Sequence, residues 1–276
     1  MTDADRKQEG DLPRNSPRLL SLFARYVRRY VGKHFNAVRV LSGTEPELPK
    51  DSPVVFYVNH PGWWDPLMMI LLATARYPER QHYAPFDAAM LRKYAFFERL
   101  GFFGVEQETR RGAARLLRAA DAIMQQPGAT LWITAEGRFT DVRDRPIVLR
   151  PGLAHIARRM PHGYIVPLAL EYTFWEESTP EALIAFGEPI DVAHADADRD
   201  VEVWQDLLQQ RLEHVMARLA EAASSRRADA FERLIAGRQG VGGIYDLWRR
   251  LKFWSRGRRF DPSHSGRPAP AEGRKP

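Results

Sequence analysis

The chain has 276 residues, of which 44% are hydrophobic and 28% are charged, and its formal net charge is +6. This length and composition are those of a globular protein with a sizeable core. The sequence contains no cysteine, which excludes disulfides, a cysteine nucleophile and thiolate zinc sites and suits a reducing compartment.

The N-terminal region predicts a basic amphipathic helix. Residues 1–10 are polar and charged, unlike a secretory signal, and Arg18 to Phe35 then follow the i, i+3, i+4, i+7 spacing of a helix. The apolar side is formed by Leu19, Leu22, Phe23, Tyr26, Val27, Tyr30 and Val31. The other side is formed by Arg18, Arg25, Arg28, Arg29 and Lys33. A basic helix with aromatic anchors is typical of a segment in a membrane interface; the alternative is a helix packed on the domain with a solvated basic face.

Strands and helices alternate through the central part of the chain. The expected strands are 54–58, 82–85, 102–105, 130–134, 165–172 and 183–186. The expected helices are 67–75, 88–97, 113–125, 152–160 and 201–222. This alternation predicts an α/β fold with a single domain, a mostly parallel sheet and flanking helices. The longest apolar run, 67–73, is far shorter than the ~20 residues of a membrane-spanning helix.

Four segments are expected along the chain: an N-terminal arm (1–35), a central domain (36–222), a basic aromatic C-terminal arm (223–260) and a disordered tail (261–276). The C-terminal arm places Arg249, Arg250, Lys252, Arg256, Arg258 and Arg259 among Trp248, Leu251, Phe253, Trp254 and Phe260. This second basic and aromatic stretch also favours a membrane surface. Nucleic acid is the other acidic partner, but no recognised nucleic-acid-binding motif accompanies the charge, so none is expected.

The turn after the strand 54–58 holds the most informative residues. His60 and Asp65 stand five positions apart, between the end of a buried strand and the start of an apolar helix. A histidine accepts a proton near neutral pH, and a carboxylate within reach fixes its tautomer and stabilises its charged form. The alternative is a histidine that only hydrogen-bonds the turn. The same spacing recurs at His82 and Asp87, without a comparable turn.

Three further clusters follow. Glu136, Gly137 and Arg138 come after the strand 130–134, where glycine permits a tight backbone and arginine can hold an anion bidentately. Taken alone, this cluster is explained more simply as a surface loop with an Arg–Glu pair. Arg150-Pro151-Gly152 opens a helix, and Val166-Pro167-Leu168 lies within a strand.

In this order, the blocks resemble those of the glycerolipid acyltransferase family, of the lysophosphatidate (1-acylglycerol-3-phosphate) type, over residues 36–222. The family's Asn-His-x4-Asp block stands here as Asn59-His60-Pro61-Gly62-Trp63-Trp64-Asp65. Its Glu-Gly block corresponds to Glu136-Gly137-Arg138, its basic-x-Gly block to Arg150-Pro151-Gly152 and its proline-containing strand to Val166-Pro167-Leu168. The Gly187-Glu188-Pro189-Ile190 segment is similar to the family's end.

The sequence also departs from the family's pattern. Gly62 replaces the usual serine, Ala135 the usual proline, and Phe139 stands where an arginine is common. The family's second block, which supplies an arginine for the acceptor's phosphate, appears here as Glu106-Gln107. Arg110 or Arg111 is then the candidate replacement.

The resemblance implies that His60 acts as general base on a lipid hydroxyl, which attacks an acyl thioester without an acyl-enzyme, and that Asp65 holds the imidazole. Acyl-CoA or acyl carrier protein is the expected donor, and a lysophospholipid the expected acceptor. It also implies that an acceptor site is formed by Asn59, Glu136, Gly137, Arg138, Arg110, Arg111 and Arg150. No cofactor and no metal are expected.

The protein is expected to bind peripherally to the cytoplasmic face of a membrane and to act there. Three alternatives stay open. One is transfer to a different lipid alcohol, another is a non-catalytic lipid-binding relative, and the third is a basic α/β protein that binds nucleic acid.

Overall fold

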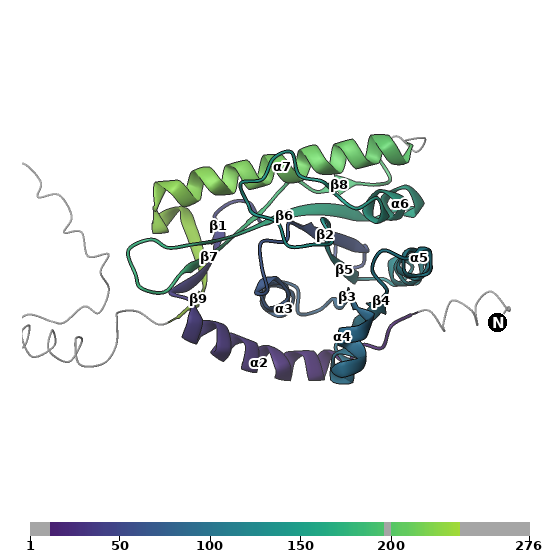
Figure 1. Cartoon of the computed structure of the whole chain (residues 1–276), viewed down its shortest axis with the longest axis horizontal. Coiled ribbons are helices and arrows are strands. Elements are labelled where there is room, and N and C mark those ends of the chain that lie inside the picture. The colour runs from purple at the N-terminus through teal and green to yellow at the C-terminus, as the bar shows by residue number, and fades with distance from the viewer. Residues whose placement is uncertain (1–11, 196–199, 238–276) are drawn as a thin grey trace, which may run out of the picture.

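The computed structural model describes residues 12–195 and 200–237, which form one α/β domain (Figure 1). Its strands are β1 (Ala37–Leu41), β2 (Val54–Val58), β3 (Gln81–Asp87), β4 (Phe102–Val105), β5 (Ala129–Thr134), β6 (Tyr164–Thr173), β7 (Glu181–Phe186), β8 (Ile190–Asp191) and β9 (Phe231–Ala236). Its α-helices are α2 (Pro17–His34), α3 (Asp65–Arg76), α4 (Ala88–Lys93), α5 (Arg110–Met124), α6 (Gly152–Arg159) and α7 (Val201–Ser225). Two 3-10 helices are η1 (Ala95–Arg99) and η2 (Ala228–Ala230).

The strands form one mixed sheet in the order β4-β3-β5-β2-β6-β7-β1-β9, with β8 paired to β6. The pairs from β4 through β6 are parallel, as is β1 with β7. The pairs β6–β7, β6–β8 and β1–β9 are antiparallel. The predicted α/β class with a mostly parallel sheet is therefore confirmed.

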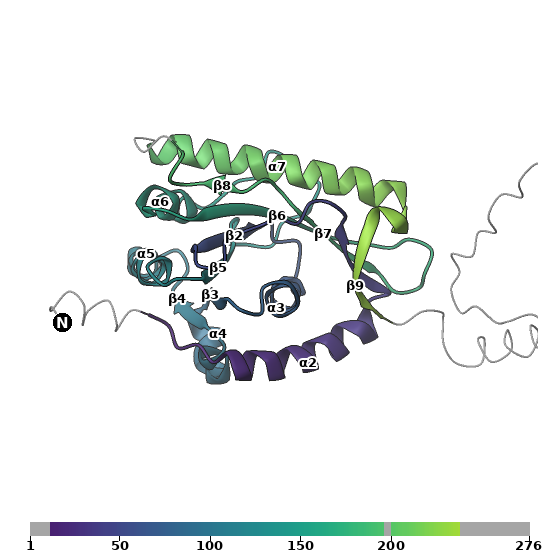
Figure 2. The ribbon, with the colours of Figure 1, turned by 180° about the vertical axis from the view of Figure 1, so that it is seen from behind.

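Helices cover both faces of the sheet, and two hydrophobic clusters fill the layers (Figures 1 and 2). α5, α6 and α7 pack on one face. On the other face α3 packs on the sheet, and α2 lies across α3. Strand β2 is buried along its whole length because both of its faces are covered. Its carboxyl end therefore opens between the layers, where α/β folds commonly place ligands.

The predicted N-terminal helix is present as α2, and its buried side overlaps the expected apolar side in part. The buried residues are Leu20, Ala24, Val27 and Val31. Leu22 and Tyr26, which were assigned to the same apolar side, are each 59% exposed. The helix thus packs on the domain and still presents large apolar side chains outward.

Three strands were not predicted: β1, β8 and β9. β9 comes from the stretch assigned to the C-terminal arm, and it pairs antiparallel with β1 at the edge of the sheet. Residues 231–236 are thus part of the sheet. The expected helix 88–97 is also divided, into α4 and the 3-10 helix η1. The basic aromatic segment Trp248 to Phe260 and the tail from Asp261 lie outside the described residues.

In the part of the chain that the structure describes, no helix is both long and apolar enough to cross a bilayer.

Candidate active site

The turn that follows β2 is held by its backbone and by one buried side chain. The His60 N–H donates to Glu136 Oε2 at 2.9 Å, and the His60 carbonyl accepts from the Thr140 N–H at 3.1 Å. The side chain of Asn59 pairs with both backbone groups of Leu170, at 3.0 and 2.7 Å. These contacts tie the turn to β6 and to the loop after β5, so the position of His60 is fixed from two neighbouring strands.

His60 and Asp65 form a close pair. The Nδ1 atom of His60 lies 2.5 Å from Oδ2 of Asp65, the first residue of α3. Asp65 is 0% exposed, and its carboxylate also accepts from the Gly62 N–H at 3.1 Å and from the Tyr172 hydroxyl at 2.6 Å. The amino end of α3 further favours its negative charge. Since a carboxylate only accepts hydrogen bonds, Nδ1 carries the proton and Nε2 has the free lone pair.

Tyr172, from β6, is the one partner of this pair that the sequence did not indicate. Burial, together with the neighbouring Asp65 charge, raises the pKa of its hydroxyl well above the ordinary value, so the hydroxyl stays a donor. Val58 pairs with Leu168 in the parallel β2–β6 ladder, and the following residues of both strands lie at the same sheet edge. That register is a long-range property, which local periodicity does not reveal.

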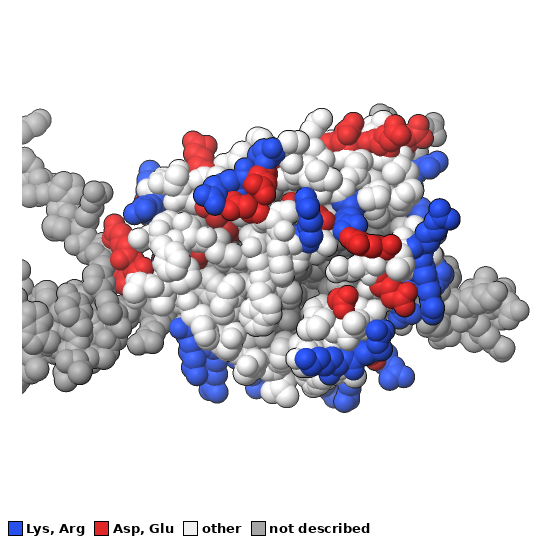
Figure 3. Space-filling model, viewed as in Figure 1, with Lys and Arg blue, Asp and Glu red and all other residues white. Residues whose placement is uncertain are grey.

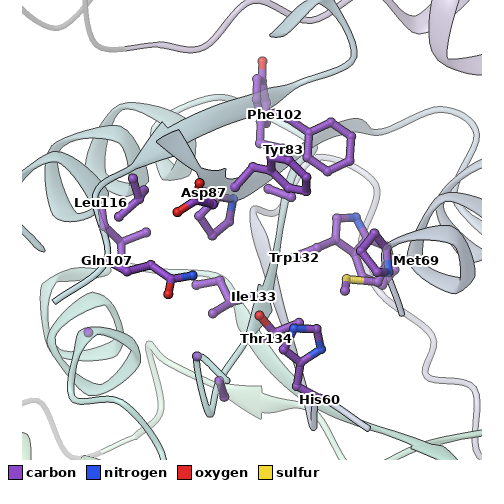
Figure 4. Close-up of a pocket in the computed structure, with 18 of the residues that line it drawn as sticks. His60, Met69, Tyr83, Asp87, Phe102, Gln107, Leu116, Trp132, Ile133 and Thr134 are labelled. Atoms are coloured by element: carbon purple, nitrogen blue, oxygen red, sulfur yellow. The ribbon is translucent and has the colours of Figure 1, made fainter. Parts of the chain in front are cut away.

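A cavity of about 590 Å³ opens beside His60 (Figure 4). Its walls are mainly apolar and come from both sides of the sheet edge, and they include Leu67, Met69, Ile70, Phe86, Phe97, Phe102, Leu116 and Trp132. The polar lining includes Asp87, Glu106, Gln107, Glu108, Thr109 and Arg150. Phe139 also lines it, with its ring centroid 4.5 Å from that of His60. The candidate base therefore faces a space suited to a hydrocarbon chain with a polar end.

The second His-x4-Asp match forms no pair. His82 is buried, its Nε2 lies 2.9 Å from the Tyr77 carbonyl, and its Nδ1 accepts from the Trp132 indole N–H at 3.3 Å. Burial lowers its pKa to about 4, so it is neutral near pH 7. Asp87 instead accepts from the Met90 N–H and caps α4. Both residues line the cavity, but neither is set up for proton transfer.

The residues expected to bind the acceptor fall into three groups: some line the cavity, some are exposed outside its lining and some are buried. Gly137 and Arg150 line the cavity. Arg138, Arg110 and Arg111 are exposed and lie outside the cavity lining. Asn59 and Glu136 are buried, and they hydrogen-bond to the backbone of Leu170 and of His60, respectively. These two side chains brace the turn, and neither is among the residues that line the cavity.

Gly137 and Arg150 depend on each other. Gly137 has φ +65°, and a Cβ there would lie 2.9 Å from Cγ of Arg150. The absence of that carbon lets the Arg150 stem cross the turn. The guanidinium then meets Glu108 at 3.2 Å, with Arg150 47% and Glu108 75% exposed. Since Arg150 is the one arginine among the cavity-lining residues, it is the site's main candidate for binding an anion.

Among residues 12–195 and 200–237, no group of three or more His, Asp or Glu side chains gathers in a way that could hold a metal ion.

One face of the molecule, shown in Figure 3, carries basic side chains along its lower edge, where Figure 1 places α2 and α4. Acidic side chains border the hollow near the middle of the same face. The charge that surrounds the cavity is thus mixed, whereas that of the α2 edge is basic.

Comparison with known proteins agrees with the resemblance read from the motifs. No curated protein matches the chain. A family model described as Acyltransferase matches residues 39–171, a segment that contains the His60 turn, the Glu136 loop, Arg150 and most of β6. The match supports an acyltransferase domain at residues 39–171, and with it the transfer of an acyl group from a donor to an acceptor in general terms.

Proposed function

We propose that this protein moves a fatty acyl group from an acyl thioester to the hydroxyl of a lysophospholipid, with His60 as general base. The observation that carries the proposal is the His60–Asp65 pair, joined at 2.5 Å, at the wall of a largely apolar cavity. A tautomer fixed by a buried carboxylate leaves Nε2 free to accept a proton. Such a base contributes about 10²–10⁴-fold to a rate.

The proposed reaction is a direct transfer. The acceptor hydroxyl gives its proton to His60 Nε2 while its oxygen attacks the thioester carbonyl carbon. The C–S bond then breaks, and the leaving sulfur takes the proton back from the imidazolium. Asp65 stabilises that cation throughout. No serine elbow of the Gly-x-Ser-x-Gly type occurs in the sequence, so no serine acyl-enzyme of that kind is invoked.

The apolar walls of the cavity suit the acyl chain, and the thioester carbonyl would lie beside His60. The donor is acyl-CoA or acyl carrier protein, because both present the acyl group at the end of a flexible arm that can reach into a cavity. Neither is a resident cofactor.

For the acceptor we propose a lysophospholipid such as 1-acylglycerol-3-phosphate, with Arg150 as the phosphate-binding residue. Arg150 lines the cavity, and the backbone at Gly137 leaves space for it. Arg138, Arg110 and Arg111 lie farther out and would act at the rim. A guanidinium binds phosphate bidentately, which suits this role.

A second acceptor class, a lipid alcohol without a phosphomonoester, is favoured by a specific observation. Three acidic side chains line the cavity, Asp87, Glu106 and Glu108, and Glu108 already pairs with Arg150. Phe139, next to the His60 ring, adds an apolar surface at the same place. A dianionic head group would have to displace Glu108 from Arg150.

We further propose that the protein works at the surface of a membrane, on its cytoplasmic face. Exposed apolar side chains from α2, α4 and η1 include Leu22, Tyr26, Met90, Tyr94 and Phe96. Trp63, at the mouth of the cavity, is 62% exposed. Basic residues on the same elements include Arg18, Arg25, Arg29, Arg92 and Lys93, and this combination suits an anionic interface.

The test is a product analysis. Purified protein is incubated with an isotopically labelled acyl thioester, presented on CoA or on acyl carrier protein, and a panel of lysolipids and neutral lipid alcohols. The expected result is a labelled ester identified by mass for at least one acceptor. Binding of lysolipid without turnover on any donor would instead favour a non-catalytic lipid-binding protein.

A further inference from the structure

Strand β6 holds the dyad through residues that do not line the cavity. Its Leu170 backbone anchors Asn59, and its Tyr172 hydroxyl donates to Asp65 at 2.6 Å. The two contacts come from positions two residues apart on one strand, one through the backbone of Leu170 and the other through the side chain of Tyr172. The Tyr172 ring also packs against Phe35, with centroids 5.7 Å apart, which limits how far the hydroxyl can move.

The carboxylate of Asp65 thus divides its acceptor capacity between its two oxygens. Oδ2 accepts from His60 and from the Gly62 N–H, whereas Oδ1 accepts from Tyr172. A carboxylate free on one side could rotate away from the imidazole. With Oδ1 held by a hydroxyl, the plane of the carboxylate is fixed and Oδ2 stays directed at Nδ1.

We infer that Tyr172 is a positioning residue that sets both the orientation and the basicity of the His60–Asp65 pair. This inference rests on the proposed function for its consequence in catalysis. Tyr172 acts through Asp65, without contact to the reacting atoms. The hydrogen bond from the Tyr172 hydroxyl to Oδ1 stabilises the negative charge of the carboxylate and so weakens its attraction for a proton on His60.

The direction of the effect follows from that electrostatics. Without the Tyr172 hydroxyl, more of the Asp65 charge faces the imidazole, and the imidazolium form of His60 becomes more stable. The pKa of His60 should then rise. Two other titratable groups lie beside the pair, namely Glu136, which accepts from the His60 N–H, and His34, whose ring packs on Trp64, and the Tyr172 substitution replaces neither. Arg150 lines the same cavity as His60 and is also unchanged.

The experiment compares Tyr172→Phe with Tyr57→Phe in the full chain. Tyr57 is a matched control because its buried hydroxyl also makes one hydrogen bond, to the Leu208 carbonyl at 3.0 Å, away from the dyad. Two readouts are needed: the pH profile of kcat/KM, and an NMR titration of the His60 imidazole that does not depend on activity.

For Tyr172→Phe we expect kcat to fall about tenfold to a hundredfold, the range for a hydrogen bond to a charged group, with KM within about twofold. The acid limb of the pH profile and the His60 titration should both move upward, by about half to one pH unit. Tyr57→Phe should lower stability and leave both titrations unchanged.

If the His60 titration of Tyr172→Phe coincides with that of the wild type, the inference is wrong, whatever the activity. Equal changes in both variants would also overturn it, because they would report a general loss of core stability. The wild type could also transfer no acyl group while the His60 titration differs between the wild type and Tyr172→Phe. In that case the proposed function fails and the role of Tyr172 stands.

Discussion

The chain contains the same five-residue interval between a histidine and an aspartate at two places, and the structure uses them in opposite ways. His60 and Asp65 are joined at 2.5 Å, and the aspartate is buried at the start of α3. His82 is bound to Tyr77 and Trp132, while Asp87 caps α4. The backbone between the two residues decides the outcome, and the spacing alone does not.

The physical difference is the path of the chain. Five steps along a strand advance about 16 Å and place the two side chains on opposite faces, so a histidine and an aspartate at either end of β3 cannot meet. A turn that ends a strand and begins a helix folds back within the same interval. Both histidines line the cavity, but one has a nitrogen free for chemistry and the other has both nitrogens engaged.

The largest expected effect is the difference in kcat between substitutions at the two aspartates, Asp65 and Asp87. Asp65→Asn should lower kcat by about 10²–10⁴-fold because an amide no longer fixes the Nδ1–H tautomer or stabilises the imidazolium. Asp87→Asn should keep turnover within about twofold, since asparagine also caps helices well. Steady-state kinetics of the two variants, with circular dichroism to verify folding, would test this contrast. Similar losses in both would break it.

The second effect concerns His82 and the pH dependence of the free energy of unfolding. Burial lowers the His82 pKa from 6.5 to about 4, so the unfolded chain binds more protons between these values. The stability that the neutral histidine supports is present above pH 6.5 and is lost as the pH falls towards 4, by about 3 kcal/mol in all. Urea unfolding of the wild type and His82→Gln at pH 7.5 and pH 5 would measure it.

The glutamine variant should be less stable at pH 7.5 and should lose less stability between the two pH values. It should also retain most of its turnover. An identical pH dependence in both proteins would mean that folding does not shift the pKa of His82.

The third effect concerns the surface that carries α2. In a chain truncated after Gly243, the paired change Arg25→Gln and Arg29→Gln should weaken binding to anionic vesicles about thirtyfold, at about 1 kcal/mol per charge. Arg28 is left intact because it donates to the Leu234 carbonyl on β9. Liposome flotation would measure the bound fraction, with Arg110→Gln and Arg111→Gln as a control of equal charge. If both double variants bind the vesicles equally, α2 is not the membrane anchor.

The smallest effect concerns the acceptor. Arg150→Gln should raise the KM for a phosphate-bearing acceptor about tenfold, the loss of one charged hydrogen bond, and leave the donor's KM unchanged. Arg138→Lys, Arg110→Ala and Arg111→Ala should each have a smaller effect, because these arginines lie outside the cavity lining. If all four variants use this acceptor like the wild type, the acceptor is a different lipid alcohol.

Local patterns in the sequence were sufficient for much of the fold. Hydrophobic periodicity and turn residues predicted the strands at β2 and β4 to the residue and placed α5, α6 and α7 within a few residues. β9 was missed because Phe231–Ala236 is half exposed and follows a charged stretch, and its strand character depends on pairing with β1 across an irregular register. Pairing between strands that are far apart in the sequence cannot be predicted from local sequence patterns.

The candidate site divides in the same way. His60, Asp65, Gly137 and Arg150 could be picked out by type and order. Tyr172 could not, because its contact with Asp65 depends on the parallel register of β6 against β2. The roles expected of Asn59 and Glu136 were assigned by residue type, whereas the structure shows that both side chains are buried and that their hydrogen bonds hold the turn.

The most direct test of the central claim is the acyl-transfer rate of His60→Ala, measured with a labelled acyl thioester and the best acceptor of the panel. The turn should stay folded, because its other anchors are the backbone of residue 60 and the Asn59 side chain. We predict that no product forms above the uncatalysed rate, while His82→Gln remains active. A folded His60→Ala protein with near-normal turnover would contradict the assignment of His60 as the catalytic base.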